Sequence, residues 1–131
     1  MSDGVLDASA LIALMLDEPG ADKVAAFLPG ALMSAVNVAE VVAKFIDRDV
    51  TSAATVYGVF DELGIEIVPF DGDQALVCGG LRWATREAGL SLGDRACIAL
   101  GKARGLPVVT ADKAWTRVAE SALIHVVVVR E

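Results

Sequence analysis

The alternation of short apolar runs with longer segments of helical periodicity constrains the fold of this chain more than any other feature. Strands that alternate with helices form βαβ units, and such units build a parallel sheet with helices on both faces. We therefore predict an α/β fold, a three-layer α/β/α sandwich around a five-stranded parallel sheet. The five predicted strands are residues 4–7, 32–34, 65–69, 107–110 and 124–129.

Helical segments fill the intervals between these strands, and polar residues predict where several of them begin. Ser9 is the predicted N-cap of the first helix, and Asn37 is the predicted N-cap of the helix that contains Phe45. Gly79 and Gly80 lie inside one long predicted helix. Because a glycine in a helix costs roughly 1 kcal/mol relative to alanine, we expect close packing at this pair. The remaining predicted helices are 21–28, 51–63, 71–88, 93–104 and a short one before the last strand.

The length and composition indicate one globular domain over residues 1–131. Of these residues, 55% are hydrophobic and 22% are charged, which excludes a disordered chain. No apolar run reaches the roughly 18 residues of a membrane span, and no secretory signal is visible, so we expect a cytoplasmic protein with no membrane contact. Cys78 and Cys97 lack the spacing of a metal site, and we interpret both as buried, reduced thiols. The mean hydropathy of +0.57 indicates apolar surface that is buried against a partner.

The charge is unevenly distributed along the chain. The net charge is −7, which by itself argues against nonspecific binding to nucleic acid. Residues 82–117 contain seven Lys and Arg residues and three Asp and Glu residues, a net charge of +4, so the rest of the chain carries −11. This basic stretch is either a set of solvated helix faces or one face that meets phosphates, and on the second interpretation Arg95 and Lys113 contact RNA.

Four carboxylates stand out by their positions relative to the predicted elements. Asp7 ends the first strand, Asp112 follows the fourth strand, and Glu40 lies in the helix after the second strand. Ligands of open parallel sheets bind beyond the carboxyl ends of the strands, so these three acids are expected at one rim. The pattern does not place Asp94 there. Each acid has another explanation, because Asp7 and Asp112 are also candidate N-caps, and Glu40 and Asp94 also complete candidate capping boxes.

The segments that carry these acids resemble the four acidic motifs of PIN-domain nucleases. In order and spacing they are most similar to the VapC-type toxins of bacterial toxin–antitoxin pairs, over essentially the whole chain. The segments are Val5-Leu-Asp7-Ala-Ser9-Ala-Leu11, Ser34-Ala-Val-Asn37-Val-Ala-Glu40-Val, Leu90-Ser-Leu-Gly-Asp94-Arg95-Ala-Cys-Ile-Ala-Leu100 and Leu106-Pro-Val-Val-Thr110-Ala-Asp112-Lys113-Ala-Trp115.

This resemblance implies a metal-dependent endoribonuclease, the toxin of a type II toxin–antitoxin system. The four acids would gather around one or two Mg²⁺ or Mn²⁺ ions, which activate water for attack on a phosphodiester. Ser9 and Thr110 would support the acids, and Asn37 would hold the turn that carries Glu40. An acid that some relatives have after the last motif is absent here, which leaves a second metal in doubt. The implied partners are an RNA substrate, a VapB-like antitoxin and a second copy in a homodimer.

Other functions fit the sequence less well. A non-catalytic PIN-like module that binds RNA or protein is the main alternative, although a scaffold gains nothing from concentrated like charges. A haloacid-dehalogenase-type phosphatase has Asp at the position where this chain has Ser9. A receiver domain has a lysine after its fifth strand, and this chain does not supply it. His125 is the only histidine and is interpreted as a strand residue, which excludes a two-histidine ribonuclease. Trp83 and Trp115 are interpreted as core or interface anchors rather than base-stacking platforms.

Overall fold

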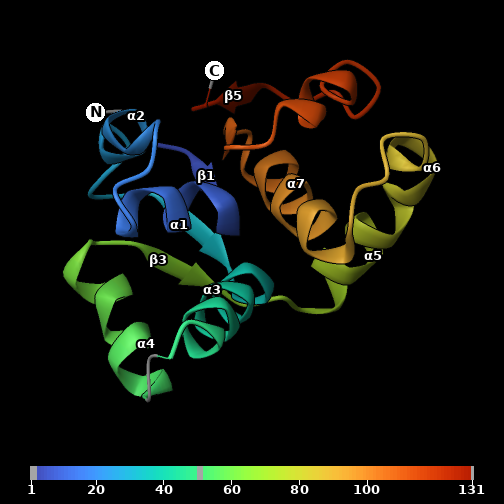
Figure 1. The fold of residues 1–131 in the computed structure, drawn as a ribbon. Helices are drawn as coiled ribbons and strands as arrows, with labels where there is room; N and C mark the ends of the chain where they lie inside the picture. The colour runs from blue at the N-terminus through green and yellow to red at the C-terminus, as the bar shows by residue number, and fades with distance from the viewer. Residues whose placement is uncertain (1–2, 50–51, 131) are drawn as a thin grey trace.

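The computed structural model describes residues 3–49 and 52–130, and its centre is a five-stranded parallel sheet. The strand order is β3-β2-β1-β4-β5, and all four neighbouring pairs are parallel (Figure 1). This confirms the predicted fold class. Four of these strands are shorter than predicted, and β2 has the predicted bounds. The strands are β1 (Val5–Leu6), β2 (Leu32–Ser34), β3 (Glu66–Val68), β4 (Val108–Thr110) and β5 (Val126–Val128).

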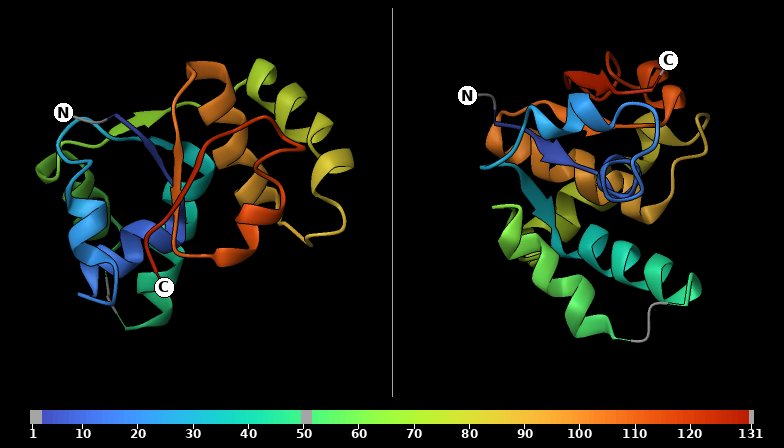
Figure 2. Two further views of the ribbon diagram at one scale, coloured as in Figure 1. Left: turned by 90° about the horizontal axis from the view of Figure 1, so that it is seen from above. Right: turned by 60° about the vertical axis from the view of Figure 1, so that its left-hand side comes forward.

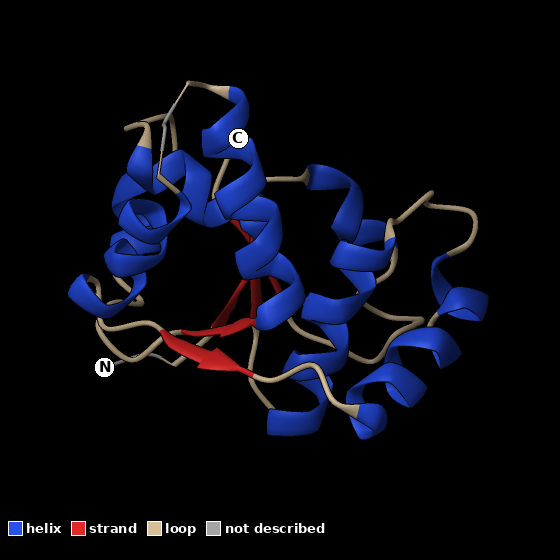
Figure 3. Cartoon of the chain, turned by 90° about the horizontal axis from the view of Figure 1, so that it is seen from below, coloured by secondary structure: helices blue, strands red, loops and turns tan. Residues whose placement is uncertain are grey.

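Helices cover both faces of the sheet, which gives the three layers (Figures 1 and 3). Seen from above, the layers lie on either side of β1, β4 and β5 (Figure 2, left). One layer contains α1 (Ala8–Met15), α2 (Ala21–Ala25), α3 (Ala35–Asp47) and α4 (Ala53–Glu62). The other contains α5 (Gly72–Gly80), α6 (Arg82–Thr85), α7 (Leu92–Arg104) and the 3₁₀ helix η1 (Lys113–Arg117).

Each strand supplies side chains to two separate cores. Val5 and Val108 pack against the layer of α7, whereas Leu6 and Val109 pack against the layer of α1. Successive side chains of a strand point to opposite faces of a sheet, so a strand covered on both faces must be apolar throughout. This is why the strand segments are continuous apolar runs rather than alternating ones.

The helix α7 is the most deeply buried helix of its layer. Its residues from Ala96 to Gly101 are all buried. A Cβ atom on Gly101 would lie 2.5 Å from Cγ1 of Val108, so the missing side chain lets α7 approach β4 closely. Burial of a side chain such as Ile98 stabilises the fold by roughly 1.5–3 kcal/mol. The helix therefore has little freedom to move relative to the sheet.

Two predicted N-caps are wrong. Asp7 rather than Ser9 caps α1, because its carboxylate accepts the Ala10 N–H at the end of β1. Ser34 rather than Asn37 caps α3, which begins two residues before Asn37. In both cases the strand runs directly into the helix, so the cap is the last residue of the strand or the one after it.

The predicted helix 71–88 is also wrong in part, because the chain forms α5 and α6 with a break at Leu81. The close packing expected at Gly79 and Gly80 is not found. No heavy atom in the described part of the chain lies within 4 Å of a Cβ placed on either glycine. Both glycines instead end α5. The predicted helix 51–63 appears as α4, and Thr51 lies outside the described residues.

The two tryptophans predicted to be core or interface anchors differ in burial. Trp115 is completely buried and belongs to the core, whereas Trp83 is 83% exposed and does not. Cys78 and Cys97 are buried and free, as predicted. His125 is exposed and immediately precedes β5, where its carbonyl accepts the Val108 N–H. Within residues 3–49 and 52–130, no helix is long and apolar enough to cross a membrane.

Candidate active site

The candidate site lies where the strand order reverses. From β1 the chain adds β2 and then β3 on one side of the sheet. It then returns to add β4 and β5 on the other side of β1. In open α/β sheets, ligands bind beyond the carboxyl ends of the strands at this switch point. Asp7 directly follows β1, so its carboxylate lies at the switch point.

The carboxylate of Asp7 is 4% exposed and is held by three groups. Its Oδ1 accepts the Ala10 N–H at 2.8 Å. The Ser9 hydroxyl lies 2.8 and 2.9 Å from the two carboxylate oxygens, and the Thr110 hydroxyl donates to Oδ2 at 2.6 Å. Hydrogen bonds to a carboxylate are stronger than neutral ones, so the position of Asp7 is well defined.

Ser9 and Thr110 also connect Asp7 to the segment after β4. The Ser9 hydroxyl accepts the Ala111 N–H at 3.0 Å, and the Thr110 hydroxyl accepts the Asp112 N–H at 3.1 Å. Each hydroxyl thus accepts a backbone hydrogen and donates its own to Asp7. Ser9 and Thr110 therefore join the ends of β1 and β4 through the Asp7 carboxylate.

Burial raises the pKa of Asp7 from its ordinary value of 3.8 to about 6. The loss of water around the charged form is the largest cause, and the hydrogen bonds from Thr110, Ala10 and Ser9 lower the pKa by less. The negative charge of Asp94 raises it further. A carboxylate with a strongly perturbed pKa at a sheet switch point marks a candidate functional site.

Glu40 reaches the site from the second turn of α3. The buried Asn37 amide donates to Glu40 Oε1 at 2.8 Å and to the Gly93 carbonyl at 2.9 Å. Asn37 therefore joins α3 to α7 and holds Glu40, although it does so inside α3 rather than as the predicted cap. The capping box expected for Asn37 and Glu40 does not form, because their bond joins two side chains.

Gly93 is a functional candidate that the sequence reasoning missed. A Cβ atom on this residue would overlap the Glu40 carboxylate, whose Cδ would be 2.5 Å away. The carboxylate of Glu40 therefore lies against the backbone of α7. The signal in the sequence was a glycine directly before Asp94, where helix propensity alone favours a larger residue.

Asp94 lies in the first turn of α7 and forms a capping box with Ser91, as one of the two interpretations predicted. Its Oδ2 accepts the Ser91 N–H at 2.9 Å, and its own N–H donates to the Ser91 hydroxyl at 3.2 Å. The capping role of Asp94 does not exclude this residue from the candidate site. One turn further along α7, the buried Cys97 thiol has a raised pKa, first because of burial and then because of the charges of Asp7, Asp94 and Glu40. Asp7, Asp94 and Glu40 therefore all lie near enough to the Cys97 thiol to influence its pKa.

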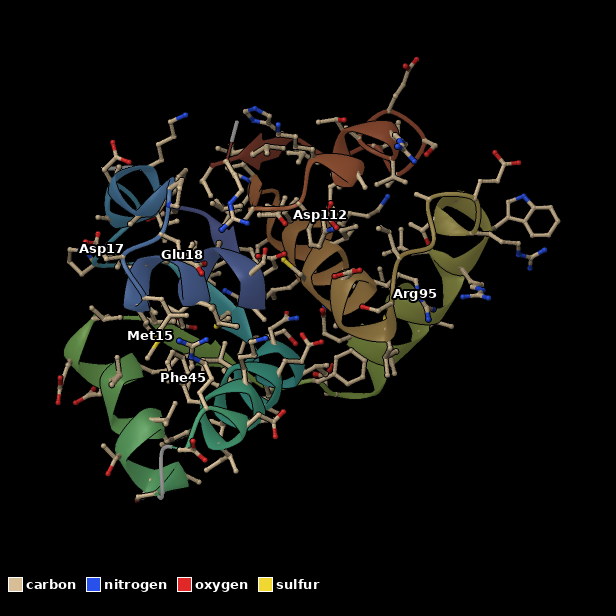
Figure 4. All side chains as sticks on the ribbon, in the orientation of Figure 1. Met15, Asp17, Glu18, Phe45, Arg95 and Asp112 are labelled. Carbon is tan, nitrogen blue, oxygen red and sulfur yellow. The ribbon has the colours of Figure 1, made fainter. Side chains whose placement is uncertain are left out.

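Asp112 lies at the edge of this cluster. It is exposed and caps η1 by accepting the Ala114 N–H at 2.9 Å (Figure 4). Its connection to Asp7 runs through its backbone N–H and the Thr110 hydroxyl. We call Asp7, Glu40, Asp94 and Asp112 the carboxylate cluster.

The donor chemistry of the carboxylate cluster fits a divalent cation. Within the described residues, one oxygen each of Glu40, Asp94 and Asp112 accepts no hydrogen bond. Unpaired carboxylate oxygens are the ligands that Mg²⁺ prefers, and this ion keeps several of its waters. No three His, Cys, Asp or Glu side chains in that part of the chain are close enough to hold an ion by themselves. Burial is the main cause of the raised pKa of Asp7, and a bound ion would relieve the smaller contribution from the charge of Asp94.

The two basic residues predicted to contact RNA differ in their surroundings. Lys113 is exposed and borders a hollow together with Ser9 and Asp112. Arg95 extends from α7 toward α5 and is half-buried, with a buried Nε that has no partner among the described residues (Figure 4). Its positive charge lowers the pKa of the Cys78 thiol, which burial raises by more.

This geometry defines a class of protein, the three-layer α/β domains with acids at the switch point of the sheet. Residues 4–121 match the PIN domain family, and the chain therefore belongs to the PIN domain family. The comparison with curated proteins finds no match.

Solved structures of similar fold cover nearly the whole chain. A toxin–antitoxin complex from Klebsiella pneumoniae has a TM-score of 0.75 at 20% identity, over 98% of each chain. VapBC-5 from Mycobacterium tuberculosis has a TM-score of 0.66 at 22% identity, over 98% of this chain and 99% of that one. VapC20 from the same organism, a sarcin–ricin loop cleaving toxin, has a TM-score of 0.68 at 16% identity, over 88% and 93%. At these identities the likeness shows the fold.

Proposed function

We propose that the chain is a metal-dependent endoribonuclease that acts as the toxin of a type II toxin–antitoxin system. The observation that carries the proposal is the buried Asp7 carboxylate at the switch point, with Glu40 and Asp94 close enough to influence the same thiol. Membership in the PIN domain family supports a nuclease. The similar structures support RNA as the substrate, since one of them is a toxin that cleaves the sarcin–ricin loop.

The proposed ligands of Mg²⁺ or Mn²⁺ are Asp7, Glu40, Asp94 and Asp112. When bound, the ion supplies a water of lowered pKa and offsets charge on the phosphoryl oxygens. The protein's contribution is to hold the acids in place. Groups that are locked by their neighbours before the ligand arrives lose little freedom on binding.

The supporting residues divide into two sets. Ser9 and Thr110 orient Asp7 through the bonds described above, so the proposed role of these hydroxyls is to hold both oxygens of one acid. Asn37 and Gly93 position Glu40, the first by an amide hydrogen bond and the second by leaving room for the carboxylate. Lys113 and Arg95 remain proposed contacts to RNA phosphates.

The proposal includes partners and a setting. We propose one catalytic domain over residues 1–131, a homodimer, a cognate VapB-like antitoxin and a cytoplasmic location. The similar structures from Klebsiella pneumoniae and Mycobacterium tuberculosis are toxin–antitoxin complexes, which supports the antitoxin. A cluster of acids is a natural receptor for an arginine of such a partner, because arginine pairs bidentately with carboxylates.

A non-catalytic module is the second candidate, and one observation favours it. The described acids do not form a group that can hold an ion by themselves. A module of this kind would bind RNA or protein at the same rim without hydrolysis. It would show no dependence of RNA cleavage on a divalent ion.

The test compares cleavage of a structured RNA by the wild type and by Asp112→Asn, with Mg²⁺ and with EDTA. Asp71→Asn is the matched control, since Asp71 is also an exposed N-cap carboxylate but lies at the start of α5. Asparagine caps a helix as well as aspartate does, so both variants should fold normally. We expect Mg²⁺-dependent cleavage that only Asp112→Asn loses. Equal activity of the two variants would contradict the proposed site.

A further inference from the structure

A second hollow lies outside the carboxylate cluster. It has a volume of about 850 Å³, and its walls come from α6 and the turn after it, and from the end of η1 and the segment that follows. Pockets of roughly 300–1,000 Å³ accommodate small ligands of nucleotide size. The residues that matter for its chemistry are Trp83, Arg86, Glu87, Arg117 and Ser121, and we call this site the Trp83 hollow.

The aromatic wall of the Trp83 hollow is accessible. The Arg86 guanidinium carbon lies 5.4 Å from the centroid of the Trp83 ring, within the range of a cation–π interaction. Trp83 is 83% exposed even with Arg86 beside it, so most of the indole is free to receive another flat group. An exposed tryptophan beside an arginine is a suitable platform for a nucleobase.

The charge of the hollow suits an anion. Neither Arg86 nor Arg117 forms an ion pair among the described residues, where Arg130 with Glu18 is the pair found. Arginine without an acidic partner is well placed to bind a phosphate bidentately. Trp83, Arg86, Glu87 and Arg117 belong to the stretch 82–117, which carries a net charge of +4, whereas the rest of the chain carries −11. This stretch is therefore the part of the chain that repels an anion least.

The two walls of the hollow are joined to each other and to the carboxylate cluster. The Ser121 hydroxyl lies 3.3 Å from both the Ala84 carbonyl and the Val118 carbonyl, so it links α6 to the segment after η1. Asp112 caps the start of η1, and Arg117 ends it five residues later. At about 2 Å of rise per residue, the backbones of Asp112 and Arg117 lie about 10 Å apart along this helix, so one residue of the carboxylate cluster and one of the hollow are joined by a single short element.

We propose that the Trp83 hollow binds one nucleotide of single-stranded RNA near the carboxylate cluster, with its base stacked on Trp83 and its phosphate paired with Arg117. The choice of RNA as the ligand rests on the proposed function. A protein partner fits the hollow less well, because it would have to supply acids for both arginines. The carboxylate of Glu87, next to Arg86 in the sequence, repels a phosphate. We therefore assign the anion contact to Arg117.

The test measures binding of a fluorescein-labelled single-stranded RNA in EDTA, by anisotropy and by tryptophan emission. The chain has two tryptophans and Trp115 is completely buried, so quenching by bound RNA reports on Trp83. Trp83→Ala should weaken binding by roughly tenfold, and Trp83→Phe should restore most of it but remove the quenching. Arg117→Ala should lower the log–log salt slope by about one. Leu76→Ala, at an apolar residue that is 77% exposed on α5, is the control and should bind normally.

Several outcomes would overturn the inference. Unchanged affinity of Trp83→Ala, or no quenching of the wild type at saturating RNA, would exclude stacking. Loss of self-association in Trp83→Ala, with RNA affinity intact, would assign the residue to a protein interface instead. Cleavage assays with Mg²⁺ separate the two proposals. Cleavage that is indifferent to Trp83 refutes the subsite alone, whereas Trp83-dependent binding without any cleavage refutes the ribonuclease alone.

Discussion

Replacement of Asp7 with asparagine should make the apo protein less sensitive to pH. Burial raises the pKa of the folded carboxyl from 3.8 to about 6, so the folded state binds this proton more tightly than the unfolded state does. The resulting stabilisation is fully present below pH 3.8 and is lost as the pH rises through 6. About 2 pKa units at 1.36 kcal/mol each give about 3 kcal/mol over the whole range. About 1.4 kcal/mol of this is lost between pH 5 and pH 8.

The assay is urea denaturation in EDTA at pH 5 and pH 8, for the wild type and Asp7→Asn. The variant should gain about 1.4 kcal/mol in free energy of unfolding relative to the wild type when the pH rises from 5 to 8. Any hydrogen bond that the amide loses acts at both pH values and cancels in this comparison. Asp71→Asn, which removes an exposed N-cap carboxylate, is the control and should keep the pH dependence of the wild type. A difference between Asp7→Asn and the wild type that is the same at both pH values would refute the reasoning.

Three further predictions concern the same site. Gly93→Ala should keep or raise the melting temperature, because alanine favours the helix and the Glu40 side chain can move aside. The same variant should lower RNA cleavage at least tenfold, because it displaces the Glu40 carboxylate. Gly79→Ala, which meets no described atom within 4 Å, is its control, and a fully active Gly93→Ala would contradict the positioning role. Thr110→Val should cost about 1–3 kcal/mol in urea denaturation, since it removes one of the three groups that hold the Asp7 carboxylate and takes the hydroxyl partner from the Asp112 N–H, whereas Thr110→Ser should retain most of the stability. EDTA should abolish cleavage, Mg²⁺ or Mn²⁺ should restore it and Ca²⁺ should do so poorly, and full cleavage in excess EDTA would exclude a metal mechanism.

The sequence by itself determined the layers of the fold and the rim at which three acids were expected. Apolar runs that alternate with helices have one low-energy arrangement, a parallel sheet buried on both faces. The carboxyl ends of parallel strands share a rim, so Asp7, Glu40 and Asp112 were predicted there. Local hydrogen bonding explains why the capping box of Ser91 and Asp94 was also predictable, since both partners lie within one helical turn.

Only the tertiary structure brought Asp94 toward Asp7 and fixed the position of Glu40. Asn37 binds the Gly93 carbonyl across 56 positions of sequence, and no local pattern encodes that contact. The same holds for the exposure of Trp83, which depends on where α5 ends and not on the character of the residue. The periodicity of a helix or strand indicates which of its faces is buried. The packing of all three layers decides which other element covers that face. The position of α7 between the sheet and α5, set by side chains that fit together over the whole core, is therefore what completed the carboxylate cluster.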